Sequence, residues 1–229
     1  MALVPLDLPD PTTWRGRWAA LAAVQAASGH GERCRALWPL WHYDDGHGSW
    51  ADLHHLDEGR AVLLGQDRND SETFYAEASD FFEERETDLL DGAPEWWEPP
   101  VRRVRDAELF LGFVYGYDGS TWHRADYELD DGFTSVGLPL LTTALTRGKI
   151  LATVERMPDA GGGRPPFEAI DALIAADGEV DAAMVAAVAP ATGWTRTPAR
   201  RRPARSSRTT RHRADPAGGR AAGRSCRTA

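Results

Sequence analysis

The chain has 229 residues, and its formal charge of −9 is the average of two unlike regions. Residues 1–194 carry 34 acidic and 15 basic side chains, a net charge of −19, whereas residues 195–229 carry 11 arginines and one aspartate. The acidic region repels nucleic-acid phosphates and anionic lipid headgroups, which excludes binding that depends on attracting them. A macromolecular partner of this region is expected to offer a basic protein surface, and electrostatic attraction would speed the encounter.

The cysteine content and the length of the apolar runs indicate the cellular compartment in which the protein is expected. Cys34 and Cys226 are the only cysteines, too few for a disulfide framework. The first seven residues show no basic start followed by a long apolar stretch, so no signal peptide is expected. No apolar run approaches the roughly 20 residues that span a bilayer. We therefore expect a cytoplasmic protein without a membrane segment.

The first part of the acidic region is predicted to contain one helix and three strands. A capped amphipathic pattern predicts a helix over residues 13–28. Residues 37–43 are typical of a strand, which Pro39 pushes toward a sheet edge or a bulge. Turn-forming residues lead to a return strand over 50–56, and a short apolar run predicts an interior strand over 61–65.

The next segment combines a helix, a loop and a hairpin. Residues 70–82 are predicted to form a helix, and the Trp96-Trp97 pair is expected in a loop closed by Pro99-Pro100. Residues 109–115 are apolar on both faces and predict a central strand. An Asp-Gly turn joins this strand to a return strand over 121–125.

Helical patterns dominate the rest of the acidic region. Residues 138–147 and 150–157 are candidate helices separated by a glycine. A glycine- and proline-rich stretch over 161–166 is predicted to be a linker. Two short amphipathic helices are expected over 167–176 and 179–189.

Tight turns between the predicted strands favour antiparallel pairing, because parallel strands need long crossovers. We therefore expect an α+β fold. It would comprise an antiparallel sheet of about four to six strands with helices packed on one face, a C-terminal helical appendage and a disordered tail. The predicted division is an acidic, aromatic-rich domain over 1–160, a linker and helical pair over 161–194, and an arginine-rich tail over 195–229.

The tail has no aromatic residue and no aliphatic residue larger than alanine, so we expect it to be disordered. One interpretation is a basic arm that contacts nucleic acid through Arg200, Arg201, Arg202 and Arg205. The other is a frameshift or read-through product. Arginine outnumbers lysine 25 to one in the chain, which indicates GC-rich coding DNA, and such DNA read out of frame yields this alphabet.

The densest group of metal-ligand types lies around the first predicted hairpin. His42 and His47 could approach each other across the turn, with Asp44 or Asp45 completing a site for zinc, manganese or iron. The same stretch continues with Asp52, His54, His55, Asp57 and Glu58. No strong metal-binding signature has this spacing, so the alternative is a solvated acidic turn whose histidines bond locally.

A second acidic run follows the helix predicted over residues 70–82. Its carboxylates are Glu83, Glu84, Glu86 and Asp88. They form a candidate surface for a basic partner, and the alternative is a solvated helix end.

No catalytic constellation or phosphate-binding loop is present, and no cofactor is expected. The leading hypothesis is a non-enzymatic protein-binding module that uses an acidic surface. Bacterial immunity proteins that neutralise basic toxin nucleases have this general character, and the likeness is one of physical type. One alternative is a metal-dependent hydrolase with a His/Asp site within residues 42–57, to which His123 contributes. The other is a nucleic-acid-associated protein acting through its tail.

Overall fold

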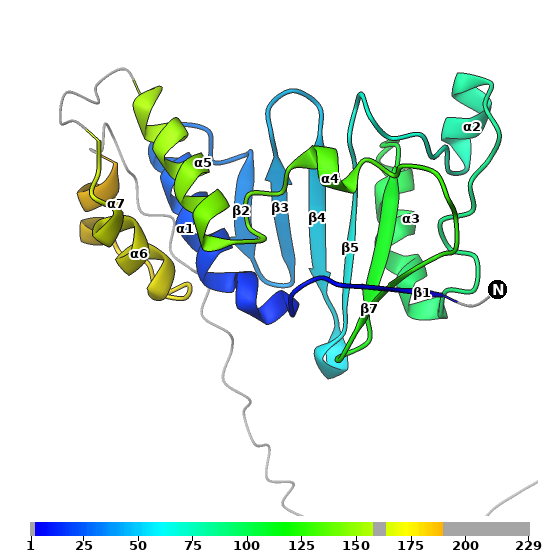
Figure 1. Cartoon of the computed structure of the whole chain (residues 1–229), viewed down its shortest axis with the longest axis horizontal. Helices are drawn as coiled ribbons and strands as arrows, with labels where there is room; N and C mark the ends of the chain where they lie inside the picture. The colour runs from blue at the N-terminus through cyan, green and yellow to red at the C-terminus, as the bar shows by residue number, and fades with distance from the viewer. Residues whose placement is uncertain (1–2, 158–163, 190–229) are drawn as a thin grey trace, which may run out of the picture. The chain divides into compact units, whose positions relative to one another are not determined.

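The computed structural model describes residues 3–157 and 164–189, which are built around one seven-stranded sheet (Figure 1). Every strand pair is antiparallel, and the spatial order is β1-β7-β6-β5-β4-β3-β2. The strands are β1 (Val4–Leu6), β2 (Cys34–Leu37), β3 (Leu40–Asp44), β4 (Trp50–His55), β5 (Ala61–Gln66), β6 (Phe113–Tyr117) and β7 (Trp122–Arg124). The expected α+β class with an antiparallel sheet is confirmed.

The sheet has more strands than the expected four to six, because both of its edges gain one. The predicted strand over 37–43 covers most of β3 and only the last residue of β2, and the two strands pair across a turn at the cis Trp38–Pro39 peptide. Pro39 therefore marks a hairpin turn, where it needs no ladder hydrogen bond. At the other edge, β1 pairs with β7 through Val4↔Arg124 and Leu6↔Trp122.

The helices lie on both sides of the sheet, whereas the sequence predicted them on one. Buried residues of α1, α5, α6 and α7 belong to one core cluster, whereas buried residues of α3, which passes behind β7 in Figure 1, belong to a second cluster. The helices are α1 (Arg15–Ala27), α2 (Glu77–Phe82), α3 (Glu98–Asp106), α4 (Phe133–Val136), α5 (Thr143–Glu155), α6 (Phe167–Ala175) and α7 (Ala182–Val188), with single 3₁₀ turns η1 (Pro11–Trp14), η2 (Asp57–Gly59) and η3 (Glu95–Trp97).

Tryptophans join α1 to the first face of the sheet. Trp14 and Trp18 are fully buried, and their rings lie 5.7 Å from Trp122 and 5.5 Å from Trp41, measured between ring centroids. The Trp18 Nε1–H also donates to the His42 carbonyl oxygen at 3.1 Å. Large aromatic rings contribute much of the apolar area in such a core, so these four indoles fix α1 against the sheet.

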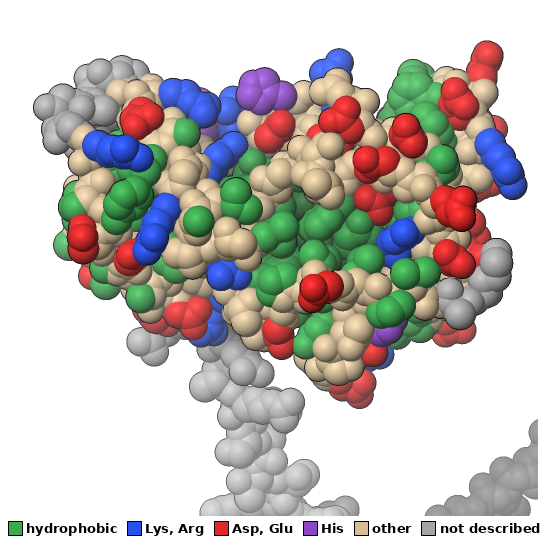
Figure 2. All heavy atoms as spheres, viewed as in Figure 1, with side chains coloured by type: hydrophobic (Ala, Val, Ile, Leu, Met, Phe, Trp, Pro, Cys, Tyr) green, Lys and Arg blue, Asp and Glu red, His purple; other side chains and the backbone are tan. Residues whose placement is uncertain are grey.

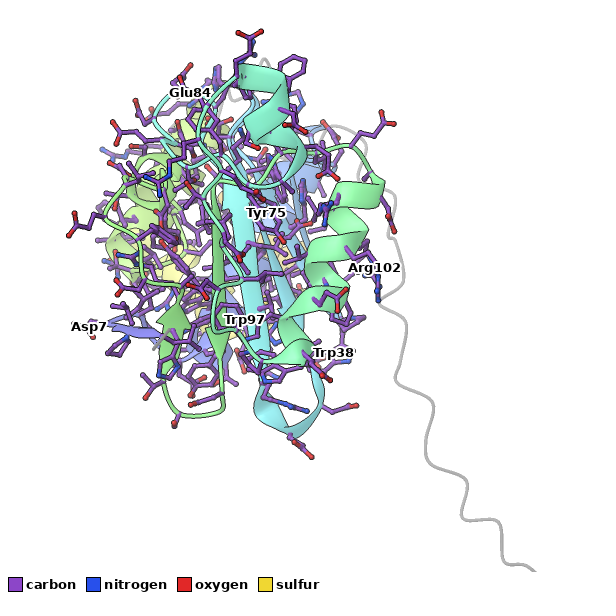
Figure 3. The ribbon with its side chains drawn as sticks, turned by 90° about the vertical axis from the view of Figure 1, so that its right-hand side faces the viewer. Asp7, Trp38, Tyr75, Glu84, Trp97 and Arg102 are labelled. Atoms are coloured by element: carbon purple, nitrogen blue, oxygen red, sulfur yellow. The ribbon has the colours of Figure 1, made fainter. Side chains whose placement is uncertain are left out.

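The second face of the sheet is covered by α3, at a place where the sequence predicted only a loop. Pro99 lies in the first turn of α3, where a missing backbone N–H leaves no helical bond unmade. Val101 and Val104 are buried in a second core cluster that also holds Trp97 (Figure 3). A Cβ atom at Gly116 would overlap the Trp97 indole, so glycine at this position of β6 lets the ring lie directly on the sheet.

The C-terminal helices differ from the prediction in one respect. The two helices expected on either side of Gly148 are one continuous helix, α5, and a Cβ at Gly148 would meet nothing within 4 Å. The expected helical pair is present as α6 and α7, whose buried residues belong to the same core cluster as α1. The predicted division into residues 1–160, 161–194 and 195–229 stays a prediction. In the described part of the chain, no helix is both long and apolar enough to cross a membrane.

Candidate functional site

Helix α2 presents large aromatic side chains to solvent. Phe81 is 70% exposed and Phe82 is 46% exposed. The Phe82 ring centroid lies 5.5 Å from that of Phe74 and 5.4 Å from that of Phe110, so rings from three segments form one cluster. We call these four rings the phenylalanine patch. Contiguous exposed apolar area with a polar rim is typical of a protein-interaction surface.

Backbone hydrogen bonds fold the acidic run back toward this patch. Helix α2 ends at Glu83, whose φ of 57° reverses the chain direction. The Glu84 N–H then donates to the Ser79 carbonyl oxygen at 3.0 Å, and the Thr87 N–H donates to the Phe74 carbonyl oxygen at 2.8 Å. Thr87 is buried, so the loop is anchored at its far end and its carboxylates point outward.

An acidic groove of about 560 Å³ lies beside the patch. Its lining carries seven carboxylates and one guanidinium, with Phe74 as an apolar element. The charged residues are Glu72, Glu84, Glu86, Asp88, Asp91, Asp126, Glu128 and Arg85. Figure 2 shows acidic side chains, in red, gathered with apolar side chains over the part of the molecule where α2 lies. In a concave site, carboxylates of one sign reinforce each other's field.

The structure brings three of the four predicted partner-binding residues into this groove. Glu84, Glu86 and Asp88 line it, whereas Glu83 lies at the end of α2 and is exposed. The sequence did not reveal the opposite wall, which comes from Glu72 and the segment after β7. Its only sequence signal was the alternation of acidic with apolar or aromatic residues over 126–130.

Hydrogen bonds fix the opposite wall of the groove. The Glu72 N–H donates to the Asp130 carbonyl oxygen at 2.7 Å. The buried Asp131 carboxylate accepts hydrogen bonds from the hydroxyls of Tyr115 at 2.6 Å and Tyr127 at 2.8 Å. Burial raises the pKa of both tyrosines, and the Asp131 charge raises it further, so both hydroxyls remain donors. The groove therefore has two anchored walls.

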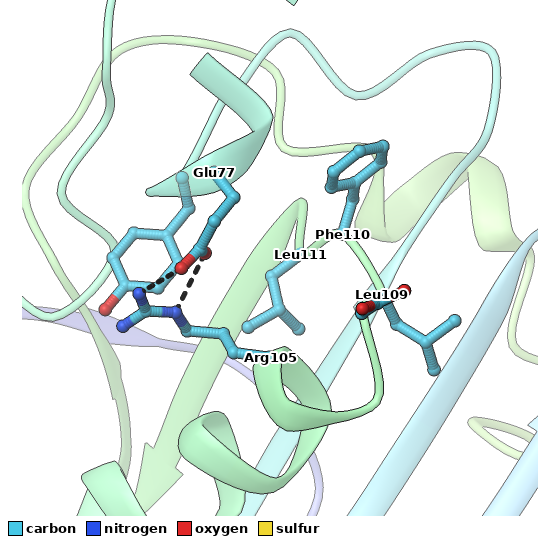
Figure 4. A pocket seen from close by; sticks show the side chains of 7 residues that line it. Glu77, Arg105, Leu109, Phe110 and Leu111 are labelled. Atoms are coloured by element: carbon cyan, nitrogen blue, oxygen red, sulfur yellow. Dashed lines mark hydrogen bonds and ion pairs between the residues drawn. The ribbon is translucent and has the colours of Figure 1, made fainter. Parts of the chain in front are cut away.

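A second cavity, of about 420 Å³, opens on the other side of the phenylalanine patch. The Glu77 carboxylate and the Arg105 guanidinium form a two-point ion pair at its rim, with Arg105 Nε 2.9 Å from Oε2 (Figure 4). The hydrogen bond from Arg105 lowers the pKa of Glu77. Leu109, Phe110 and Leu111 supply the apolar lining. We call this cavity the Arg105 pocket.

The groove and the Arg105 pocket belong to one continuous surface. Phe74 lines the groove, Phe110 lines the pocket, and the Phe82 ring contacts both. In Figure 3, the labelled Glu84 lies beside α2, and Tyr75 lies below it, nearer the sheet. We refer to the groove, the patch and the pocket together as the acidic–aromatic surface.

The predicted metal ligands lie apart. His42 projects from β3 toward its cross-strand partner Asp52, with 2.6 Å between Nδ1 and Oδ1. His47 is 80% exposed at the hairpin tip, where its ring lies 3.7 Å from the Asp45 carboxylate. Asp44 and Asp45 accept backbone N–H bonds within the turn. Across residues 3–157 and 164–189, no three His, Cys, Asp or Glu side chains are grouped so that they could hold a metal ion.

The other histidines of this stretch have separate neighbours. His54 is buried on β4, and burial lowers its pKa. His55 lies between Trp38 and Trp41, with ring centroids 4.8 Å and 4.2 Å away. His123, on β7, lies 3.9 Å from the Asp118 carboxylate. These contacts do not bring His123 into a common site with His42.

The proposed nucleic-acid contacts Arg200, Arg201, Arg202 and Arg205 lie outside the described residues. Comparison of the chain with protein-family models, with curated proteins and with solved structures gave no match.

Proposed function

We propose that this protein is a non-enzymatic, cytoplasmic bacterial binding module that captures a basic protein through its acidic–aromatic surface. The observation that carries the proposal is the combination of seven carboxylates in one groove with the exposed phenylalanine patch beside it. The surface would act as an immunity protein does, by covering a basic region of its partner.

Charge and apolar area have different roles in this proposal. The groove carboxylates would attract lysine and arginine side chains and orient the partner during the encounter. Most of the affinity would come from desolvating apolar anchors, because a few central aromatic residues dominate the energetics of most interfaces. Phe81 and Phe82 are suited to this role because α2 holds them out into solvent.

The Arg105 pocket supports a specific arrangement of the partner. Its apolar wall of Leu109, Phe110 and Leu111 can receive an aliphatic side chain, while basic side chains occupy the groove. A peptide that spans both must therefore combine arginines with leucine. A purely cationic chain would lack the apolar anchor and bind more weakly.

Binding of a synthetic peptide that contains several arginines and two leucines tests the proposal. Fluorescence anisotropy with the full-length protein should detect the labelled peptide. Versions with glutamine for arginine, or alanine for leucine, should each bind more weakly. The triple variant Glu84→Lys, Glu86→Lys and Asp88→Lys should weaken binding on the order of 100-fold at low salt, since each reversed surface charge changes binding by roughly 1 kcal/mol.

A matched triple variant separates the groove from total charge. Glu155, Glu168 and Glu179 are exposed on or near α5, α6 and α7, and replacing all three with lysine changes the net charge by the same amount. This control should retain nearly all of the affinity. Equal losses in the two triple variants would mean that only net charge matters, and the groove would then have no specific role. Failure of the wild-type protein to bind the peptide would count against the proposal directly.

A further inference from the structure

A third cavity lies on the α1–α5 side of the molecule, away from α2. Its volume is about 330 Å³. The C-terminal end of α1, the loop before β2, the β3–β4 turn and the C-terminal half of α5 all contribute side chains. The charged groups among them are Arg33, Lys149, Arg156 and Asp45, and the imidazole of His30 lies beside them. In Figure 2, Lys and Arg side chains, in blue, gather over the region of α1 and α5.

The charge of this cavity is opposite to that of the region around it. Arg33, Lys149 and Arg156 face a single carboxylate, Asp45, although residues 1–194 have a net charge of −19. Within the described residues, none of the three cations has a carboxylate oxygen within 4 Å. We call this cavity the basic pocket.

Asp45 is already engaged by its own turn. Its Oδ1 accepts backbone N–H bonds from His47 at 2.6 Å and from Ser49 at 3.2 Å. The carboxylate attracts Lys149 from a distance but does not pair with it. One distant carboxylate therefore leaves the three cations largely uncompensated. Clustered cations are stable in such a site when an anion neutralises them.

Lys149 is the most confined of the three cations. It is half-buried on α5, and its Nζ lies 5.4 Å from the centroid of the Tyr43 ring. Burial lowers the pKa of the Lys149 ammonium, and the neighbouring Arg156 lowers it further. Both effects oppose its positive charge, and the attraction of a bound anion would favour the charged form. Lys149 is also the only lysine in the chain, which gives this pocket a unique chemical label.

We propose that the basic pocket binds a small phosphorylated molecule, with Arg33, Lys149 and Arg156 as contacts to the phosphate group. Guanidinium groups match the oxygen geometry of phosphate and can each make two hydrogen bonds to it. The volume leaves space for a small organic group beside the phosphate. A nucleic-acid strand is a poor ligand here, because its neighbouring phosphates would meet the acidic surface outside the pocket.

Acylation of the single lysine tests this proposal on the full-length protein. An amine-reactive reagent is added, and mass spectrometry of peptides follows the rate at Lys149, with the α-amino group as an internal reference. The additions are inorganic phosphate, glycerol phosphate, acetate and chloride, at equal ionic strength. At about ten times its Kd a ligand should slow acylation roughly tenfold, because it leaves only about a tenth of the sites free. We expect this from both phosphate compounds and from neither control anion.

Two variants tie the protection to the pocket. Arg33→Gln combined with Arg156→Gln should abolish the protection by phosphate. Arg102→Gln, which removes an exposed arginine from α3, should leave it unchanged. Circular dichroism and thermal unfolding should show that both variants are folded. Equal protection by acetate or chloride, or undiminished protection in the double variant, would overturn the proposal. The outcome is independent of peptide binding at the acidic–aromatic surface.

Discussion

The acidic–aromatic surface and the basic pocket differ in how the chain builds them. The surface consists of the six-residue helix α2, Arg105 at the C-terminal end of α3, and loops between β5 and β6 and after β7. The pocket lies between the two 13-residue helices α1 and α5, with side chains from the loop before β2 and from the β3–β4 turn, and none of its lining side chains is a large exposed apolar one. A region with a strongly negative net charge can therefore contain two local electrostatic fields of opposite sign. Net charge alone is therefore a poor guide to what each region binds.

The largest expected effect comes from a substitution that disrupts the acidic–aromatic surface and leaves the basic pocket intact. Gly116→Ala places a methyl group inside the Trp97 ring, so the indole must move off the sheet. Since Trp97 and α3 support the Arg105 pocket, peptide affinity should fall together with stability. We expect a loss of about 3 kcal/mol or more in the free energy of unfolding, measured with denaturant. Phosphate protection of Lys149 should persist under native conditions.

Gly148→Ala is the matched control for Gly116→Ala. A Cβ there meets nothing within 4 Å, so the change should stabilise α5 by roughly 0.5–1 kcal/mol. If both substitutions lowered stability equally, close packing of Trp97 would not be the reason for glycine at position 116.

A pH effect on stability should arise away from both candidate binding sites. Burial, together with a smaller contribution from the neighbouring His54, lowers the pKa of His55 to about 4. The unfolded chain, with a histidine pKa near 6.5, binds this proton more tightly than the folded one. The free energy of unfolding should thus be highest above pH 6.5 and fall as the pH drops toward 4. The contribution is on the order of 2 kcal/mol, discounted because the ring is partly exposed.

His55→Gln isolates this contribution. Glutamine does not titrate, so subtracting the variant's pH curve from that of the wild type should leave a slope only between about pH 6.5 and 4. Denaturant unfolding across this range provides both curves. Parallel curves would show that protonation of His55 has no part in acid destabilisation.

Phe82→Ala should lower the affinity for the peptide at the acidic–aromatic surface with little change in the free energy of unfolding. The ring is 46% exposed, so its removal should cost less than about 1 kcal/mol of folding free energy. As a central apolar anchor, it should contribute about 1–2 kcal/mol to peptide binding, a loss of roughly 5- to 30-fold. Phe167 on α6 is 48% exposed and is the matched control. Phe167→Ala should bind the peptide as the wild type does, and a similar loss there would remove the special role of α2.

Local patterns in the sequence were enough to predict the fold class and most central strands. The predicted strands over 50–56 and 61–65 match β4 and β5 because their apolar runs and turns are contiguous in the chain. The incorrect predictions concern the strands at the sheet edges and the structural roles of two prolines. Pro39 makes a hairpin turn and Pro99 begins a helix, and which role a proline takes depends on what packs against it.

The candidate sites were likewise predictable only where their residues are close together in the sequence. Glu84, Glu86 and Asp88 were predictable as a charged run, but the opposite wall depends on Glu72 meeting Asp130 across 58 positions. The basic pocket was not predicted, since Arg33 and Lys149 are 116 positions apart. The predicted approach of His42 to His47 failed for a local reason. Pairing of His42 with Asp52 fixes its side chain within the sheet, while His47 lies beyond the last strand pair.

The smallest expected effect concerns the field inside the basic pocket. Arg156→Gln removes a like charge beside Lys149, so the pKa of Lys149 should rise toward its ordinary value. Burial, the largest cause, and Arg33 still lower the pKa of Lys149 in this variant, so the rise should be partial. The pH dependence of acylation should shift to higher pH, with a slower reaction at neutral pH because less free amine is present. Peptide binding at the acidic–aromatic surface should not change, since Arg156 lines neither the groove nor the Arg105 pocket. An unshifted acylation profile would mean that burial alone sets the reactivity of Lys149, and the pocket would then lack the mutual repulsion that makes an anion favourable.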